Sequence, residues 1–267
     1  MSVTTARVCL IDGFRVAVDD VRADPAVSGL PHGVQRLIAH LGLCGCPARG
    51  AIAGRLWPDV PESHAQGSLR SALWRAQKAL PGLVEASGGA VALAEGVRVD
   101  VREFVDWTRA VLDRGTPVDR LEVPTTALAG ELLPGWYDDW VLLERERLRQ
   151  LRLHALEVLA DRLVLAGRFG EAVQAACAAA RDEPLRESAH RAIVRAHLAE
   201  GNLAEAIRAY TAFRDALARE LGVAPTRQMQ DLASRWQVCT VLGHEGPGSL
   251  PVPRRAVDPA TAGVPNA

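Results

Sequence analysis

An internal repeat limits what the second half of this chain can fold into. Residues 166–173 (AGRFGEAV) match residues 200–207 (EGNLAEAI) at an offset of 34 residues. That offset is the period of repeats in which each unit is a pair of antiparallel helices. Ala172 and Ala206 occupy equivalent positions, where a small side chain lets two helices approach closely. The repeat therefore predicts an array of helix pairs.

The helices around the repeat are predicted by their start and stop signals. Gly167 and Gly201 end the helices that precede the two repeated segments. Further helices are expected over residues 137–166, 185–199, 203–221 and 226–240. We attribute Asp138 and Asp139 to the favourable position of a carboxylate in a first helical turn, rather than to a catalytic pair. From residue 244 onward, proline and glycine with few apolar residues predict a disordered tail.

A D-x-x-E pattern marks the start of this helical part. Asp100 and Glu103 fit a helix N-terminal cap, and apolar residues follow them at helical spacing. We therefore place a domain boundary after residue 98. Contacts between the two parts are expected mainly at Trp74 and at a hairpin over residues 83–94.

The first 98 residues have the element order of a winged helix-turn-helix. Two short strands, 7–11 and 14–18, flank Asp12-Gly13, a pair typical of tight hairpins. Three helices are then expected from residue 31 into the 42–47 region, over 48–56 and over 62–80, followed by a hairpin that turns at Ser87-Gly88-Gly89. In that fold the third helix reads the DNA bases and the closing hairpin lies beside the backbone.

The third helix has an apolar face and a basic, hydrogen-bonding face. In ESHAQGSLRSALWRAQKAL, the apolar residues that share one side at 3.6 residues per turn are Ala65, Leu69, Ala72, Leu73, Ala76 and Leu80. Beyond Glu62 the opposite side has no acidic residue, which suits the major groove of DNA. The predicted DNA-binding residues are Ser68, Arg70, Ser71, Arg75, Gln77 and Lys78. A solvated surface helix is the alternative that this pattern alone leaves open.

Two tryptophans accompany this helix. Trp57 ends the second helix and is expected to pack against the third as part of the core. Trp74 lies opposite the apolar face, so it either packs on the neighbouring domain or lies near the sugar-phosphate backbone. We favour packing for both side chains.

Composition limits the class of protein. The length of 267 residues predicts two domains or one large one. The 31 basic and 32 acidic residues nearly balance, so any surface that binds nucleic acid must be a local cluster of positive charge.

No apolar run approaches the roughly 18 residues of a membrane helix, and no signal peptide is expected. Five cysteines fit reduced thiols in the cytoplasm. Cys44 and Cys46 lack a second ligand pair nearby, so we expect no metal there.

Catalysis is not expected, because the common catalytic and nucleotide-binding motifs are absent. The sequence contains no G-x-x-x-x-G-K loop, no H-E-x-x-H helix and no G-x-S-x-G turn. We therefore expect no cofactor and no enzyme activity.

Several stretches of the chain are those of a known family: LIAHLGL and GRLWPD (37–43 and 54–59), LRSALWRAQKAL (69–80), ELLPGWYDDWVLLERERLRQLRLHALE (131–157), the repeat, and LGVAPT (221–226). Through them the chain resembles the SARP family, the antibiotic-pathway activators of actinomycetes. Members of this family join a winged helix of the response-regulator type to a bacterial transcriptional activator domain. The resemblance covers roughly residues 5–240, and it implies a short, stand-alone form without the nucleotide-binding domain of larger members.

The resemblance also implies a function. Such a regulator would bind direct repeats in a promoter of double-stranded DNA, recruit RNA polymerase and activate a secondary-metabolite gene cluster. A homodimer on DNA would be compatible with this. Gln77 stands where the family often has a basic residue, so one phosphate contact is lost.

The sequence therefore predicts a mainly α protein with three segments. These are a winged helix-turn-helix with a small sheet and a C-terminal hairpin (1–98), a tetratricopeptide-like all-α activator domain (99–240) and a disordered tail (241–267). A protein-binding adaptor, with a winged helix that does not bind DNA, is the alternative function.

Overall fold

The computed structural model describes residues 6–18, 29–121, 123–124 and 130–242. The chain divides into two compact units, Met1–Pro225 and Thr226–Ala267. The second unit contains helix α11 (Arg227–Leu242), which matches the last predicted helix within two residues. The predicted disordered tail lies outside the described residues, apart from the end of α11.

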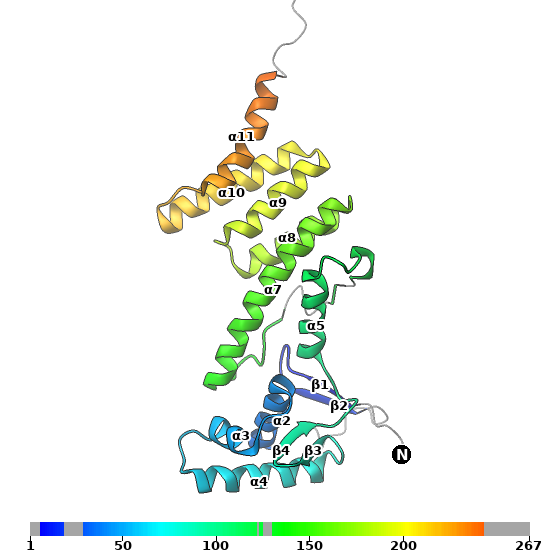
Figure 1. Cartoon of the computed structure of the whole chain (residues 1–267). Coiled ribbons are helices and arrows are strands. Elements are labelled where there is room, and N and C mark those ends of the chain that lie inside the picture. Colours follow the sequence, from blue (N-terminus) through cyan, green and yellow to red (C-terminus); the bar gives the residue numbers. More distant parts are fainter. Residues whose placement is uncertain (1–5, 19–28, 122, 125–129, 243–267) are drawn as a thin grey trace, which may run out of the picture. The chain divides into compact units, whose positions relative to one another are not determined.

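A small sheet opens the first unit (Figure 1). Strands β1 (Ala6–Cys9) and β2 (Arg15–Val18) pair antiparallel, as predicted, and the turn between them contains Asp12 at φ 60° and Gly13 at φ 117°. Strand β5 (Arg98–Val99) adds to the other side of β1 in parallel, which gives the order β2-β1-β5. The sequence did not predict β5, because two residues are too few to show alternation.

Three helices and a hairpin complete the predicted winged helix. They are α2 (His32–Cys44), α3 (Arg49–Leu56), α4 (Glu62–Ala79) and the strands β3 (Val84–Ser87) and β4 (Ala90–Leu93). The hairpin lies beside the start of α3, since the N–H of Arg49 donates to the carbonyl of Gly89 at 3.1 Å. The mainly α fold class, with a winged helix-turn-helix before a helical domain, is confirmed.

The predicted cap at Asp100 is wrong. Helix α5 (Asp100–Leu112) has Val99 at its N-cap, and no side chain caps it. The buried Asp100 carboxylate instead accepts hydrogen bonds from the N–H groups of Leu10 and Ile11 at 2.9–3.0 Å. The pairing of β5 with β1 places these donors beside Asp100, and a local sequence pattern cannot show partners about ninety residues away.

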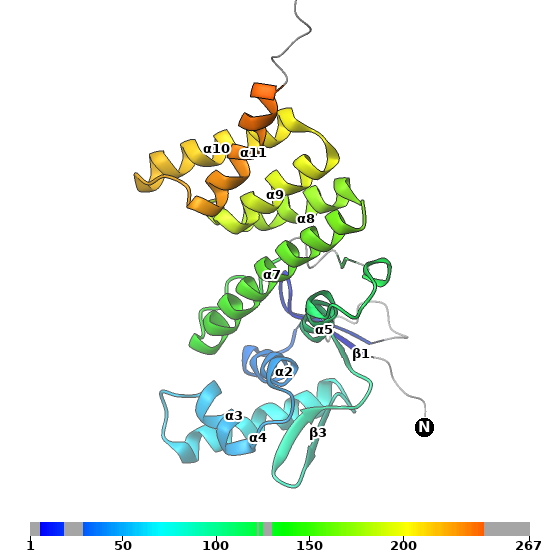
Figure 2. The same cartoon turned by 45° about the horizontal axis from the view of Figure 1, so that its top comes forward.

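The helical part follows the predicted repeat (Figure 2). After a short 3-10 turn, η1 (Val118–Arg120), come the helices α7 (Asp139–Leu165), α8 (Phe169–Asp182), α9 (Glu187–Glu200) and α10 (Leu203–Leu221). Helices α8 and α10 begin at the two positions that the repeat equates. Ala172 and Ala206 are both completely buried, as a close helix contact requires.

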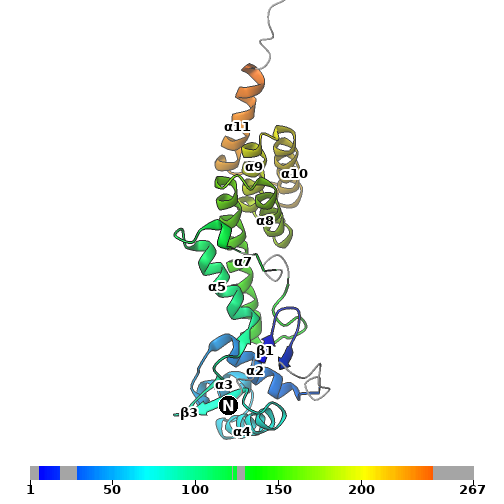
Figure 3. The same ribbon diagram turned by 90° about the vertical axis from the view of Figure 1, so that its right-hand side faces the viewer.

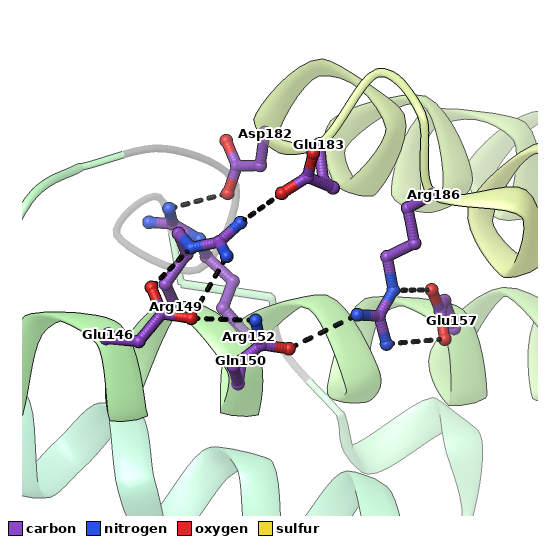
Figure 4. A network of polar contacts seen from close by, with 8 residues as sticks. All are labelled: Glu146, Arg149, Gln150, Arg152, Glu157, Asp182, Glu183 and Arg186. Carbon is purple, nitrogen blue, oxygen red and sulfur yellow. Dashed lines mark hydrogen bonds and ion pairs between the residues drawn. The ribbon is translucent and has the colours of Figure 1, made fainter. Parts of the chain in front are cut away.

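Ion pairs attach the connection between α8 and α9 to α7 (Figure 4). Arg149 contacts both Glu146 and Glu183, and hydrogen bonds from Arg149 and Gln150 lower the pKa of Glu146 to about 2. Arg152 pairs with Asp182, the last residue of α8. Arg186, which precedes α9, pairs with Glu157. Charged groups along α7 therefore hold this connection.

The two parts meet along α2 and α5, which differs from the expected contacts at Trp74 and the hairpin. Helix α5 lies alongside α7 (Figure 3). Helix α2 contacts the segment at the start of α7 through three residue pairs: His32 with Trp136, Arg36 with Asp138, and His40 with Trp140. We call these the three α2–α7 pairs. Asp138 therefore forms an ion pair with Arg36 in addition to being the N-cap residue of α7. One hydrophobic core runs from Ala6 to Ala196.

Candidate nucleic-acid interface

Helix α4 lies at the edge of the winged helix, with α2 and α3 on one side of it (Figures 1 and 3). Ala65, Leu69, Ala72 and Ala76 face those helices and are at most 5% exposed. Of the six residues predicted to bind DNA, Ser68 is half-buried, and the others, Arg70, Ser71, Arg75, Gln77 and Lys78, are exposed. The expected division of α4 into a core face and a free face is therefore correct.

The six residues do not form one row. Ser68, Ser71 and Arg75 line a groove of about 660 Å³ between α4 and the start of α2. At 100° per residue, Arg70 and Gln77 lie on the opposite flank of α4. On that flank Gln66 approaches Gly50 near the start of α3. Helix α4 thus presents two flanks, one toward each neighbouring helix start.

The groove offers hydrogen-bond donors and no carboxylate. It is lined by Pro31, Gly33, Val34, Trp57, Val60, Ser63, His64, Gly67, Ser68, Ser71, Ala72 and Arg75. Helix α2 begins here without a side-chain cap and without an acidic residue in its first turn. The N–H of Val34 donates to the carbonyl of Pro31 at 2.8 Å, so the N–H groups of residues 32 and 33 are the ones without a helical partner. The positive end of the dipole of α2 lies at the groove. Such a surface is chemically suited to a phosphate.

The basic residues of α4 are free of acidic partners. Arg70, Arg75 and Lys78 make no ion pair with any described residue, whereas arginines of α7 and its neighbours are widely paired. Glu62 in the first turn is the one acidic residue of α4. The charges of this face are therefore available to a polyanion, although the chain as a whole carries a net charge of −1.

The two tryptophans differ in their environments. Trp57 is half-buried against the core, and Gly33 of α2 lies close to its ring, so its predicted structural role is confirmed. Trp74 does not pack on the neighbouring domain: it is 63% exposed, and the prediction of packing is wrong. It lies opposite the buried row of α4. Lys78 Nζ lies 5.3 Å from the centre of the indole ring.

The groove itself was not predicted. Ser63 and His64 contribute to it together with Pro31, Gly33 and Val34, and their proximity depends on how α2 packs on α4. The sequence does indicate where α2 and α4 begin, because a proline, Pro31 or Pro61, is the N-cap residue of each helix. It does not indicate that the starts of these two helices lie on opposite sides of one groove.

Other kinds of site have little support in the described part of the chain. Within it, no group of three or more His, Cys, Asp or Glu residues is arranged to hold a metal ion. Cys9, Cys44, Cys46 and Cys177 are free thiols. None of the described helices combines the length and apolar character needed to cross a membrane.

Comparison with known proteins identifies the family. Residues 99–236 match the model of the bacterial transcriptional activator domain, and a winged helix-turn-helix precedes them. The chain belongs to the SARP family of transcriptional activators. Two regulatory proteins named AfsR are similar to this SARP chain: 33% identical over 195 residues in Streptomyces coelicolor and 31% identical over 202 residues in Streptomyces griseus.

Each match covers 70% of this chain and 20% of the AfsR protein, so the chain spans about a fifth of the length of these relatives. Among solved structures, Mycobacterium tuberculosis EmbR, in complex with a low-affinity phosphopeptide, has a similar fold with a TM-score of 0.68. That similarity covers 88% of this chain and 66% of EmbR at 19% sequence identity. It supports the winged helix followed by a helical domain.

Proposed function

We propose that this protein is a sequence-specific DNA-binding transcriptional activator, and that α4 enters the major groove of double-stranded DNA. The observation that carries this proposal is the unpaired basic face of α4 in a chain without excess positive charge. A surface helix without a partner would gain from interspersed acids, and this face has none. A polyanion accounts for both the sign and the location of these charges.

The two flanks of α4 suggest a division of roles. Arg70 is nearer the start of α4, the end that usually approaches base edges, so we assign it to base recognition. Ser68, Ser71 and Arg75 share the groove with the start of α2, and we assign them to a phosphate. Lys78, two turns after Arg70, contacts the backbone alone.

The activator domain supplies the second half of the function. We extend the proposal to binding of direct repeats in a promoter, as a homodimer or as adjacent copies, and to recruitment of RNA polymerase through the helical domain. A secondary-metabolite gene cluster is the proposed target, and the cytoplasm the proposed compartment. The proposed domains remain residues 1–98 and 99–240.

Removal of Arg70 tests the assignment to base recognition. Arg70→Ala should weaken binding to the true site by about 1–3 kcal/mol and binding to random duplexes by less, because a base contact is lost. Fluorescence anisotropy with full-length protein and both duplexes measures the ratio. Equal losses on both duplexes would reassign Arg70 to a phosphate.

Removal of Lys78 tests the backbone contact. Lys78→Ala should weaken binding to specific and random duplexes alike and reduce the salt slope by about one unit, because one phosphate contact is lost. Arg109→Ala is the matched control, since Arg109 is an exposed arginine of α5 that pairs with Asp106. If neither Arg70→Ala nor Lys78→Ala changed binding relative to this control, the protein-binding adaptor would be the better description.

A further inference from the structure

Trp74 occupies the centre of the proposed DNA-facing surface. Its indole is 63% exposed, which is unusual for the largest side chain of a helix with a well-packed opposite face. Arg70 lies four residues before it and Lys78 four residues after it, so both flank it along one face of α4. Lys78 Nζ lies 5.3 Å from the ring centre, a distance at which a cation is attracted to the indole. This contact favours an outward orientation of the ring.

We propose that Trp74 is a specificity-determining residue that contacts the methyl group of a thymine in the major groove. The inference rests on the proposed function and adds a ligand chemistry to it. In the major groove the C5-methyl group of thymine is the apolar feature of the base edges, and apolar side chains recognise it. The charged ends of arginine and lysine suit hydrogen-bond acceptors rather than a methyl group, and the indole is the one large apolar side chain on the exposed face of α4.

The surroundings of Trp74 favour DNA over a protein as its partner. Apolar protein-docking sites consist of several apolar side chains inside a polar rim. Here the exposed neighbours on α4 are Arg70, Ser71, Gln77 and Lys78, which are all polar or basic. A single aromatic ring among unpaired cations complements a polyanion that carries isolated methyl groups.

The position of Trp74 on α4 also favours the bases over the backbone. On one flank, Ser71 and Arg75 belong to the groove that we assign to a phosphate. Trp74 lies between that groove and the flank of Arg70 and Gln77, directly opposite the buried row. When a helix is inserted in the major groove, the side opposite its buried row faces the floor of the groove, where the base edges are.

Deoxyuridine substitution isolates the methyl contact, because deoxyuridine differs from thymidine by that methyl group alone. A binding site is first selected from random duplexes with the full-length protein, and each thymine of the footprint is then replaced singly. We expect a loss of about 3- to 5-fold at one or two positions, as for one buried methyl group. Trp74→Ala should bind the thymine and uracil duplexes at those positions equally. Trp74→Phe should retain the discrimination.

Controls separate this inference from the proposed function. Deoxyuridine outside the footprint should have no effect, and both variants should keep the wild-type melting temperature because Trp74 is exposed. Two outcomes would overturn the role of Trp74 and leave the proposed function intact. In the first, the protein binds a specific site whose footprint contains no thymine. In the second, deoxyuridine has no effect on specific binding at any thymine of the footprint. Discrimination that persists in Trp74→Ala would assign the methyl contact to another residue. Absence of specific binding to any duplex would overturn both.

Discussion

His40 is a titratable side chain enclosed between the two halves of the protein. It is 2% exposed, meets the edge of Trp140 at 5.3 Å between ring centres, and lies 3.7 Å from Cys44 Sγ through Nδ1. Burial lowers its pKa from 6.5 to about 4; Arg55 adds to this effect and Glu144 opposes it. His40 is therefore neutral in the folded protein at physiological pH.

This histidine should make the protein sensitive to acid. Its pKa is lower in the folded than in the unfolded state, so its contribution is fully present above pH 6.5 and is lost as the pH falls toward about 4. We expect about 2 kcal/mol of the free energy of unfolding to be lost between pH 7.5 and pH 5. Urea unfolding at both pH values measures the loss.

The matched variants are His40→Gln and, as control, the exposed His154→Gln. His40→Gln should lose less stability on acidification than wild type, while His154→Gln should follow wild type. The same acid loss in wild type and His40→Gln would show that another group is responsible.

At the scale of helices, periodicity predicted most of what the structure contains. The ends of α3, α4 and α10 agree with the predictions within a residue or two, because each coincides with a proline, a glycine or a tryptophan-proline break. The repeat predicted where α8 and α10 begin. These features are local, or they repeat, so one sequence is enough to reveal them.

The features that were missed depend on contacts between distant residues. The pattern at Asp100 looks like a cap, but its carboxylate binds the backbone of residues 10 and 11. Trp74 was expected to find a packing partner because it is large and apolar, yet no described element covers it. The groove between α2 and α4 likewise exists only after the helices pack. Periodicity identifies the buried face of a helix, but it does not say what lies opposite.

The repeat can be tested at its two small residues. Ala172→Leu and Ala206→Leu should each lower the free energy of unfolding by about 1–3 kcal/mol, because both side chains are completely buried and a larger one overpacks the contact. Urea unfolding measures the change. Ala212→Leu is the control, since Ala212 is exposed on α10. Wild-type stability in both buried variants would contradict a close helix contact at these positions.

At the scale of the whole chain, the winged helix and the activator domain share structure across the proposed boundary after residue 98. Strand β5 pairs with β1, and the Asp100 carboxylate accepts hydrogen bonds from Leu10 and Ile11 just after β1. Arg102 of α5 donates to the carbonyls of Leu41 and Gly42 near the end of α2. The core continues through both parts. The proposed boundary therefore does not separate two structurally independent units.

Two fragments test how far the winged helix is independent. Residues 1–98 should fold and bind DNA weakly, and residues 1–113 should unfold at a higher urea concentration because they keep Asp100 and Arg102. Circular dichroism during urea titration compares the two midpoints. If fragments 1–98 and 1–113 unfolded at the same urea concentration, the contacts made by α5 would not contribute to the stability of the winged helix. An unfolded 1–98 fragment would refute the independence of this domain.

The three α2–α7 pairs restrict how this protein can be recombined. His32, Arg36 and His40 stand at every fourth residue of α2, and their partners in residues 136–140 belong to the activator domain. A hybrid joined at residue 98 would bring a foreign surface against α2 and leave the guanidinium of Arg36 without its carboxylate. Gene fusion at that point, whether by an engineer or in evolution, would join two domains that do not recognise each other. A fragment that is to keep these three pairs after transfer to another protein must therefore extend into α7.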